Sequence, residues 1–391
     1  MAKALLKAYT KEVLAFDLPT EEPQHPKPIS QDVFTKALKR ISFKVAKTPE
    51  AEIIILGIGT GNFIKQIALE FSPKVMVIET DIVRARQFSN TENITLLADT
   101  SVPALLMLTL QYCASSPIVI RNPECDFTQS TAPLRKLENF LLRSRFFDQI
   151  PTQQTQPDLT VGAILHPQEP NLQEFAGSLP KFITELVLVW DCQSREEISS
   201  QIALIEANTN IPVKHIVRPL DHDFSAQRNA MLEATSTEWM IYIDADERFS
   251  ESAWQAIHQS AEFAMQADVT IGGYYFPRQT YLGDTSQCRI GYGLWPDLQL
   301  RLFRTKGVRF INPVHEQLQG INHPTAILPH CVIHHYSHLS KAPETLERKL
   351  DLFSRAANED VHHVLNKEYP AIMTNLLQFE DVAEVIVLPT K

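Results

Sequence analysis

The sequence predicts an α/β protein made of two successive sets of alternating strands and helices. Three observations predict this class. Apolar runs of strand length alternate with helical stretches. The length of 391 residues exceeds what one ordinary core holds. A polar segment rich in Pro and Gln, Gln149–Asp158, separates the two sets as a linker. We therefore expect a lead-in over 1–30, a first domain over 31–150, a second over 158–340 and a helical C-terminal extension over 341–391.

The elements of the first domain follow the proline-rich segment 18–30, which reads as an extended lead-in. Four apolar runs then predict parallel strands with helices between them: Glu52–Gly57, Lys74–Thr80, Ile94–Ala98 and Pro117–Arg121.

The second domain repeats the pattern before its character changes. Its predicted strands are Thr160–Leu165, Glu185–Trp190, Val213–Arg218 and Trp239–Asp244. From Gly272 to about His338 the chain is aromatic, punctuated by glycine and strand-like. The tail from Pro343 reads as a helix because Leu346, Leu350 and Phe353 recur at helical spacing.

Composition excludes several classes of function. The net charge of −10 with no basic stripe argues against a nucleic-acid partner. No apolar run approaches the length of an integral membrane segment, and the N-terminus lacks the apolar core of a signal peptide. Five cysteines without a C-x-x-C pair fit a reducing compartment, so we expect a cytoplasmic protein.

The acidic run Asp244-Ala245-Asp246-Glu247 follows an apolar strand. If the strand runs over 239–243, alternation places Asp244 and Asp246 on one side of its end. Two carboxylates roughly 6–7 Å apart repel by about 2–3 kcal/mol at an effective dielectric of about 20. A divalent cation that also holds a diphosphate would relieve this repulsion, although for a bare Asp-x-Asp a solvated acidic loop is the more common explanation.

Two flanking motifs favour the cation. Upstream, Asp223 or Ser225 caps a helix whose first turn carries Arg228 and Asn229, a setting that suits an anionic group. Downstream, Asp297 follows Trp295-Pro296, a partly desolvated setting that could prepare it to act as a base, and Arg301 alternates with Gln299 on a predicted strand. An ordinary capped surface helix and a plain strand are the alternatives for these two motifs.

The motifs Asp-Phe-Ser-x-x-Arg-Asn, Asp-Ala-Asp-Glu, Trp-Pro-Asp-x-Gln-x-Arg-Leu-Phe-Arg and Val-His-Glu occur in this order. In this respect residues 158–340 resemble the family-2 glycosyltransferases, and within them the lipopolysaccharide-core glucosyltransferases. The resemblance implies a GT-A fold, a nucleotide-sugar donor, of which a UDP-sugar is the expected kind, Mn²⁺ or Mg²⁺, and inversion at the anomeric carbon. The implied acceptor is a saccharide, a lipid-linked saccharide or a protein.

The resemblance also implies roles for single residues. Asp246 matches the metal ligand of the Asp-x-Asp motif, and Asp244 matches the acid that contacts ribose or metal. The remaining positions match as follows: Asp191 the acid that contacts the nucleotide, Arg228 and Asn229 the donor-side helix, Asp297 the base that deprotonates the acceptor, Arg301 the basic residue near the diphosphate, and His315 a C-terminal histidine for metal or phosphate. Glu247 is the second candidate for the base because it adjoins the metal-binding acids.

The second domain departs from the family pattern at two loops. Leu165-His166-Pro167-Gln168-Glu169 replaces the usual Asn-Glu pair, and Asp191-Cys192-Gln193-Ser194-Arg195-Glu196 replaces Asp-Ser-Gly-Ser-x-Asp. The histidines over 330–338 lie on one apparent strand, which separates His334 from His335 and disfavours a zinc site. His335 stays a candidate contact for donor-site metal or acceptor.

The first domain carries its own motif. A strand runs into Gly57-Ile58-Gly59-Thr60-Gly61 and then a helix, and Glu79 closes the next strand. Residues 35–145 look like a class I S-adenosylmethionine methyltransferase scaffold, although Ile55 stands where that family has an acid. The resemblance implies that the three glycines and Glu79 bind the cofactor.

Three interpretations of the first domain remain open from sequence: an active methyltransferase, a nucleotide-binding domain without chemistry, and a packing or docking domain. For the whole chain we expect an inverting glycosyltransferase. The alternatives are a methyltransferase whose second domain recognises carbohydrate, and a non-catalytic assembly protein.

Overall fold

The computed structural model describes residues 2–16, 26, 28–71, 74–88, 94–113, 117–125, 132–150, 157–266, 270–340, 370–377 and 382–390. The chain divides into two compact units, each built from several segments. The first unit consists of Met1–Arg145, Thr285–Asp297 and Glu368–Val382. The second consists of Phe146–Asp284, Leu298–Lys367 and Ala383–Lys391. The sequence-based division differs because it made 158–340 one continuous domain.

The first unit is built on a sheet of order β3-β2-β1-β4, and every pair in it is parallel. The strands are β1 (Ile53–Leu56), β2 (Val75–Glu79), β3 (Thr95–Ala98) and β4 (Ile118–Arg121). Its helices are α2 (Gln31–Lys47), α3 (Asn62–Phe71), α4 (Ile82–Phe88), α5 (Val102–Tyr112) and α6 (Ala132–Arg143). All four residues of β1 are buried, as expected for a parallel strand covered on both faces. The four predicted strands are therefore confirmed.

The lead-in predicted over 1–30 contains a helix. Helix α1 (Ala2–Ala15) packs against β3 and buries Leu5, Leu6, Tyr9 and Val13. Tyr9 follows Leu5 and Leu6 by four and three positions and Val13 follows Tyr9 by four, so they form one helical face, which explains why a Lys-rich segment folds here. The later segments of this unit contribute β12 (Asp284–Arg289), β18 (Ala371–Met373) and the short 3₁₀ helix η3 (Thr374–Leu376).

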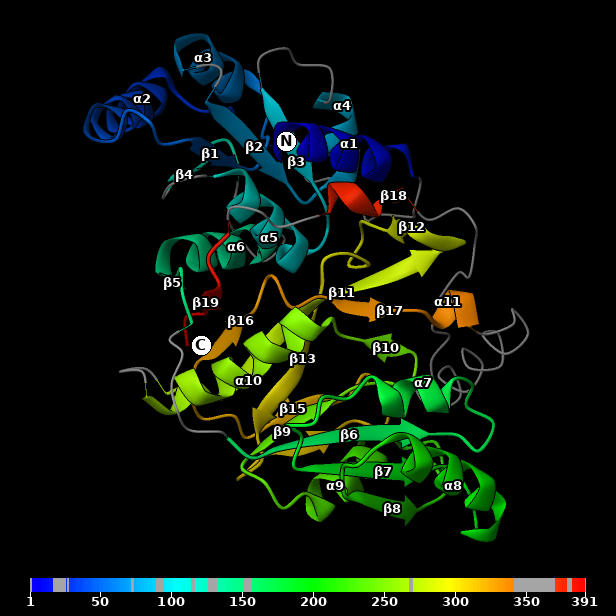
Figure 1. Ribbon diagram of the computed structural model, residues 1–391. Helices are drawn as coiled ribbons and strands as arrows, with labels where there is room; N and C mark the ends of the chain where they lie inside the picture. The colour runs from blue at the N-terminus through cyan, green and yellow to red at the C-terminus, as the bar shows by residue number, and fades with distance from the viewer. Residues whose placement is uncertain are drawn as a thin grey trace. The chain divides into compact units, whose positions relative to one another are not determined.

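The second unit is built on a larger sheet of order β5-β19-β16-β11-β13-β9-β6-β7-β8 (Figure 1). Strands β8, β7, β6 and β9 run parallel, and β13 joins β9 in antiparallel pairing. The strands of this path are β5 (Arg145–Phe147), β6 (Leu159–Leu165), β7 (Glu185–Trp190), β8 (Val213–Val217), β9 (Trp239–Tyr242), β11 (Gly273–Leu282), β13 (Asp297–Arg304), β16 (Thr325–Ile327) and β19 (Val385–Val387).

Shorter elements complete the second unit. They are α7 (Leu172–Gly177), η2 (Glu196–Ile198), α8 (Ser199–Asn208), α9 (Phe224–Ala234), β10 (Glu247–Arg248), α10 (Glu251–Gln266), β14 (Arg309–Ile311), β15 (Gln317–Gln319), β17 (Ile333–His335) and α11 (Ser337–Ser340). Helix α9 packs on β6, β7 and β8, and β17 pairs with β10 and β11. The core on both sides of the sheet is apolar and holds Trp190 and Trp239.

The C-terminal extension differs from the helix that its sequence predicts. The positions that carried the helical spacing, Leu346, Leu350 and Phe353, lie outside the described residues. The described part of the tail contains β18 and β19, and β19 pairs with β16 in antiparallel orientation. The three consecutive β-branched residues of Val385–Val387 suit a buried strand, so the expectation of an entirely helical tail is wrong.

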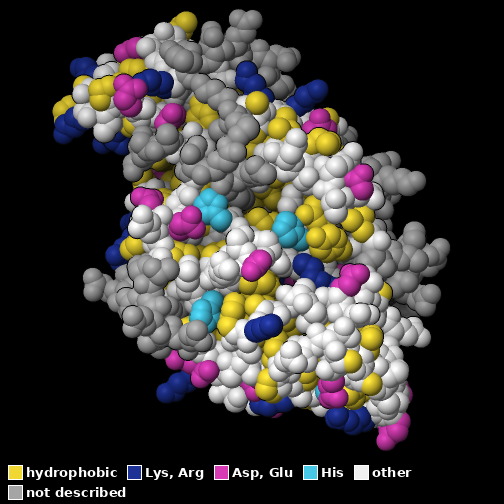
Figure 2. All heavy atoms as spheres, in the orientation of Figure 1, with side chains coloured by type: hydrophobic (Ala, Val, Ile, Leu, Met, Phe, Trp, Pro, Cys, Tyr) yellow, Lys and Arg dark blue, Asp and Glu magenta, His cyan; other side chains and the backbone are white. Residues whose placement is uncertain are grey.

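The surface of α2 combines charge with apolar side chains. Figure 2 shows Lys and Arg side chains beside hydrophobic ones over this helix. Phe43 is 62% exposed and Val33 is 42% exposed. Among the described residues, no helix has both the length and the apolar character needed to cross a bilayer.

Candidate active site

The acidic run lies in a tight turn. Strand β9 ends at Tyr242, and the backbone N–H of Glu247 donates to the carbonyl oxygen of Asp244 at 2.9 Å. The chain therefore reverses over Asp244–Glu247 before β10 begins. This corrects the expectation that strand alternation places Asp244 and Asp246 on one side, because alternation ends where the turn starts.

A buried ion-pair network holds this turn. Arg301, on β13, is 2% exposed and places Nη2 2.6 Å from Glu247 Oε1 and 3.4 Å from Asp244 Oδ2. Glu247 Oε2 also accepts the backbone N–H of Asp244 at 3.0 Å, and Arg278 Nη1 lies 3.5 Å from Glu247 Oε1. Arg301 thus connects the strand next to β9 with both ends of the turn.

The same network corrects the candidacy of Glu247 as a base. Its side chain is fully buried, and this burial raises the pKa of Glu247 while Arg301 opposes the rise. A base for an incoming hydroxyl must lie within hydrogen-bond reach of that hydroxyl. Glu247 instead binds Arg301 and the backbone of the turn, so its place is that of a positioning residue.

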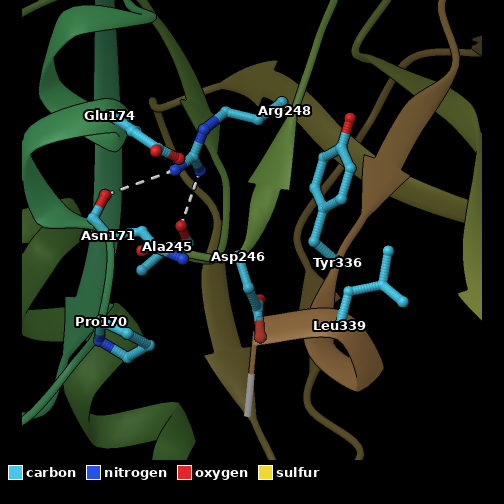
Figure 3. Close-up of a pocket in the computed structure, with 8 residues that line it drawn as sticks. All are labelled: Pro170, Asn171, Glu174, Ala245, Asp246, Arg248, Tyr336 and Leu339. Carbon is cyan, nitrogen blue, oxygen red and sulfur yellow. Dashed lines mark hydrogen bonds between the residues drawn. The ribbon is translucent and has the colours of Figure 1, made fainter. Parts of the chain in front are cut away.

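Asp246 contacts a different element, β17. Its side chain is 3% exposed, and its Oδ1 lies 3.7 Å from Nε2 of His335. The backbone N–H of Tyr336 donates to the carbonyl oxygen of Asp246 at 2.9 Å, next to the antiparallel pair of β10 and β17. Asp246 also lines a pocket of about 320 Å³ (Figure 3).

Helix α9 places a second arginine beside the turn. Asp223 caps this helix by accepting the N–H of Ala226 at 2.9 Å, as the sequence predicts. Arg228 Nε donates to Glu316 at 2.9 Å, and its guanidinium lies 4.2 Å from the ring centre of Tyr242. The guanidinium of Arg301 lies 4.5 Å from the same ring. Two arginines therefore meet at the last residue of β9.

Asn229 has a structural position. Its side-chain amide donates to the carbonyl oxygen of Phe310 at 2.9 Å and accepts the N–H of Phe310 at 2.8 Å. These two hydrogen bonds join α9 to β14 and fix the helical turn that carries Arg228. The structure thus gives Asn229 a positioning role, and its contact with the donor stays a prediction.

Asp191 lies directly after β7, at the edge where β6 and β9 also end. Its Oδ1 accepts the backbone N–H of Leu220 at 2.8 Å. The carboxyl edge of parallel strands is where α/β sheets bind ligands. Asp191 follows β7 and the acidic turn follows β9, the two strands that flank β6. The strand order therefore brings both groups to the same edge of the sheet.

Asp297 is the first residue of β13 and is partly exposed. Because residues two apart on a strand share a face, Asp297 lies on the same face of β13 as Arg301. This partial exposure distinguishes it from Glu247 as a candidate base.

The predicted three-residue metal site is not formed. Asp244, Asp246 and the exposed His315 belong to the described residues, in which no group of three or more His, Cys, Asp or Glu side chains is arranged to hold a metal ion. The two aspartates alone still fit Mg²⁺ or Mn²⁺, since such ions are commonly held by one or two carboxylates together with substrate phosphates. His315 is not needed for that arrangement.

The glycine-rich loop of the first unit is filled by its own chain. A Cβ atom on Gly57 would lie 2.6 Å from Cys125 Sγ, one on Gly59 2.6 Å from Glu124 Cβ, and one on Gly61 2.8 Å from the Phe88 ring. The glycines therefore allow close approach, as predicted, but the approaching groups are side chains of this unit. No ligand is needed to explain them.

Glu124 occupies the position at which this loop could bind an anion. Its carboxylate accepts the N–H of Thr60 at 2.9 Å, the hydroxyl of Thr60 at 2.7 Å and the N–H of Phe63 at 3.3 Å. These donors lie at the N-terminus of α3, where helices attract negative groups. An internal carboxylate thus satisfies them.

Glu79 is similarly engaged. Its oxygens accept backbone N–H groups of Ile58 at 2.8 Å, Thr80 at 2.8 Å and Asp81 at 3.0 Å. The binding of S-adenosylmethionine by Gly57, Gly59, Gly61 and Glu79 stays a prediction, since the contacts of Glu79 and Glu124 all lie within the chain itself. Local patterns do not predict the role of Glu124, because its partners lie about 60 residues earlier in the chain.

Comparison with known proteins finds a match within the second unit. Residues 166–315 match the family described as Glycosyl transferase family 2. The SPbeta prophage-derived glycosyltransferase SunS of Bacillus subtilis strain 168 and the glycosyltransferase SunS of Bacillus phage SPbeta are each 26% identical over 172 residues, or 43% of this chain and 36% of theirs. The chain thus spans little more than a third of the curated relatives it matches.

Solved structures give a weaker likeness. TarS 1–349 of S. aureus in complex with UDP-GlcNAc is 15% identical, with 52% of this chain and 68% of that chain covered and a TM-score of 0.31. GalNAc-T7 with UDP, GalNAc and Mn²⁺ is 13% identical, with 41% of this chain and 29% of that chain covered and a TM-score of 0.28.

Proposed function

We propose that this chain moves a sugar from a nucleotide-diphosphate donor to an acceptor hydroxyl with inversion, because residues 166–315 match the family described as Glycosyl transferase family 2. The observation that carries the proposal is the fixed acidic turn. Arg301 and Glu247 form a buried pair at 2.6 Å that holds Asp244 and Asp246 at the ligand-binding edge of the sheet. Asp191 follows a neighbouring strand of that edge and would contact the nucleotide.

The proposed reaction is a single displacement. The acceptor oxygen attacks the anomeric carbon, the bond from that carbon to the diphosphate oxygen breaks, and Asp297 takes the proton of the acceptor hydroxyl. Inversion follows because the attack comes from the face opposite the leaving group.

Charge relief at the leaving group is the second requirement. Arg228 and Arg301, which both lie against Tyr242, would draw the diphosphate towards the turn. A divalent ion held by Asp244 and Asp246 together with diphosphate oxygens would supply further charge neutralisation. The expected donor is a UDP-sugar, and the acceptor is a saccharide, a lipid-linked saccharide or a protein.

The test is nucleotide release from a panel of nucleotide-sugars, measured with and without EDTA and with acceptor candidates of the three kinds. We expect release that EDTA removes and Mn²⁺ or Mg²⁺ restores. Asp297→Asn should lower kcat by about 100- to 10,000-fold, the usual contribution of a positioned base. The exposed Glu233 on α9 supplies the control variant Glu233→Gln, which should match the wild type.

Each part of the proposal has its own contrary result. Full activity of Asp246→Asn, or activity in EDTA, would contradict the proposed role of the metal. Full activity of Asp297→Asn would remove the base. Absence of release from every donor would overturn the transferase function itself. Among the described residues, none of the contacts around the glycine-rich loop favours the methyltransferase alternative.

A further inference from the structure

The pocket beside Asp246 is a built cavity of the second unit. Its volume is about 320 Å³, within the lower range of small-molecule sites. Figure 3 shows Asp246 between two walls, with Pro170, Glu174 and Arg248 on one side and Tyr336 and Leu339 on the other. These residues come from the loop before α7, from α7, from the acidic turn and β10, and from the segment after β17.

The backbone fixes the two walls relative to the turn. Arg248 Nη1 donates to the carbonyl oxygens of Ala245 at 2.6 Å and Glu247 at 2.7 Å, so the guanidinium braces the turn. On the opposite wall, Tyr336 donates its N–H to Asp246, and the N–H of Leu339 donates to the carbonyl oxygen of Tyr336 at 2.8 Å. Hydrogen bonds to main-chain carbonyl oxygens therefore hold the shape of the pocket.

The chemistry of the lining selects a class of ligand. Tyr336, Leu339 and Pro170 offer apolar surface, and the carboxylates of Glu174 and Asp246 accept hydrogen bonds. Because Asp246 is assigned to the divalent ion, Glu174 and Arg248 are the remaining charged groups of the lining, and their opposite charges leave it suited to a neutral ligand. A neutral ring with hydroxyl groups on its edge and C–H groups on its face satisfies both kinds of surface.

We propose that this pocket holds the pyranose ring of a sugar substrate, with the Tyr336 ring as its packing surface and Glu174 as an acceptor for its hydroxyl groups. This inference rests on the proposed transferase function, since the pocket adjoins the aspartate assigned to the donor diphosphate. It adds two residues that determine which sugar is used. The ring belongs to the donor or to a saccharide acceptor, and binding experiments separate these two sources.

The test compares Tyr336→Ala, Tyr336→Phe and Glu174→Gln with the wild type and with the control Glu233→Gln. Calorimetry measures binding of UDP and of UDP-sugars in the presence of Mn²⁺. We expect UDP to bind all variants equally, whereas Tyr336→Ala and Glu174→Gln weaken binding of the UDP-sugar by about tenfold, as loss of one charged hydrogen bond or a packed ring predicts. Tyr336→Phe keeps the ring and should bind like the wild type.

The other outcomes are equally decisive. If binding of the UDP-sugar is unchanged but the KM for a saccharide acceptor rises about tenfold, the ring is that of the acceptor and the subsite stands. If neither changes in folded variants with the wild-type melting temperature, the subsite is overturned.

Failure of the proposed function is recognised separately. If the wild type binds no nucleotide, saturation-transfer NMR with free monosaccharides tests the pocket alone. A signal that Tyr336→Ala removes would keep the sugar subsite without the transferase function. Absence of that signal would overturn the subsite as well.

Discussion

At the scale of single residues, the site depends on one buried arginine. Arg301 is 2% exposed and has carboxylate partners at 2.6 and 3.4 Å, and Glu247 is fully buried. Such a pair contributes little net stability when complete, but removing one partner leaves a buried charge uncompensated. The value of the pair therefore lies in fixing the conformation of the turn.

We expect Arg301→Met to lower the free energy of unfolding of the second unit by about 3–5 kcal/mol, because Glu247 loses its closest cation. The double variant Arg301→Met with Glu247→Gln should recover part of this loss, since the remaining group is then neutral. Urea unfolding, followed by the fluorescence of the buried Trp190, Trp239 and Trp254, measures the free energy of unfolding of each variant.

A surface carboxylate supplies the control for this cycle. Glu206→Gln removes a half-exposed group 3.6 Å from His215 and should cost less than about 1 kcal/mol. Additive losses in the double variant, with no recovery, would contradict the role of Arg301 as the compensating charge for Glu247.

Local sequence patterns predicted some of these residues better than others. The acids after β9 and β7 are conspicuous because each follows an apolar strand. The partners of Glu247 are not conspicuous in the sequence, since Arg301 and Arg278 lie 54 and 31 residues further along the chain. Burial, which decides the protonation of Glu247, is not visible in the sequence either. An acid next to two proposed metal ligands looks like a candidate base until its exposure is known.

At the scale of elements, α1 is joined to the first sheet through a buried acid. The Tyr9 hydroxyl of α1 donates to Asp99, which follows β3, and the backbone N–H of Ser101 donates to Asp99 at 2.7 Å. Burial raises the pKa of Asp99 to about 6, and the hydrogen bonds from Tyr9 and Ser101 limit the rise. The helix that the sequence assigned to an extended lead-in thus covers an ionisable group.

This pKa predicts a pH dependence of stability. Between pH 3.8 and about 6 the folded chain keeps a proton on Asp99 that the unfolded chain has lost, so stability from this group falls as pH rises through that window. The full effect corresponds to about 3 kcal/mol at the standard conversion per pKa unit. Asp99→Asn should remove this part of the slope.

Urea unfolding at pH steps from about 4 to 7, followed by circular dichroism, measures the difference between wild type and Asp99→Asn. The exposed Asp32 of α2 supplies the control Asp32→Asn, whose slope should follow the wild type. An identical slope for Asp99→Asn and wild type would contradict a raised pKa at Asp99.

At the scale of the whole molecule, local patterns predicted β1 to β4 and β6 to β9 but not the division of the chain. Apolar runs mark parallel strands wherever both faces are covered, which is why β1 to β4 and β6 to β9 were recognisable. The assignment of Thr285–Asp297 and Glu368–Val382 to the first unit depends on contacts between distant segments. No periodic pattern in the sequence predicts that these late segments pack in the first unit.

These returning segments make specific contacts inside the first unit. The Tyr9 hydroxyl donates to the carbonyl oxygen of Trp295 at 3.0 Å and accepts the N–H of Gly291 at 3.2 Å. The Tyr292 hydroxyl donates to the carbonyl oxygens of Val13 at 2.9 Å and Phe16 at 3.1 Å. Helix α1 is thus held by residues almost 300 positions later in the chain.

A chain truncated after Ile150 therefore should not reproduce the first unit. It keeps β1 to β4 and their helices but loses β12, β18 and the partners of Tyr9 and Tyr292, so we expect α1 to exchange its amide hydrogens freely and to be cleaved first by protease. Hydrogen exchange of the truncated and complete chains measures this, and Tyr292→Phe in the complete chain, which removes one hydroxyl only, should show a small part of the effect. Equal protection of α1 in the truncated and complete chains would mean that residues 1–150 fold independently, as the sequence-based division holds, and that the returning segments are peripheral to the unit.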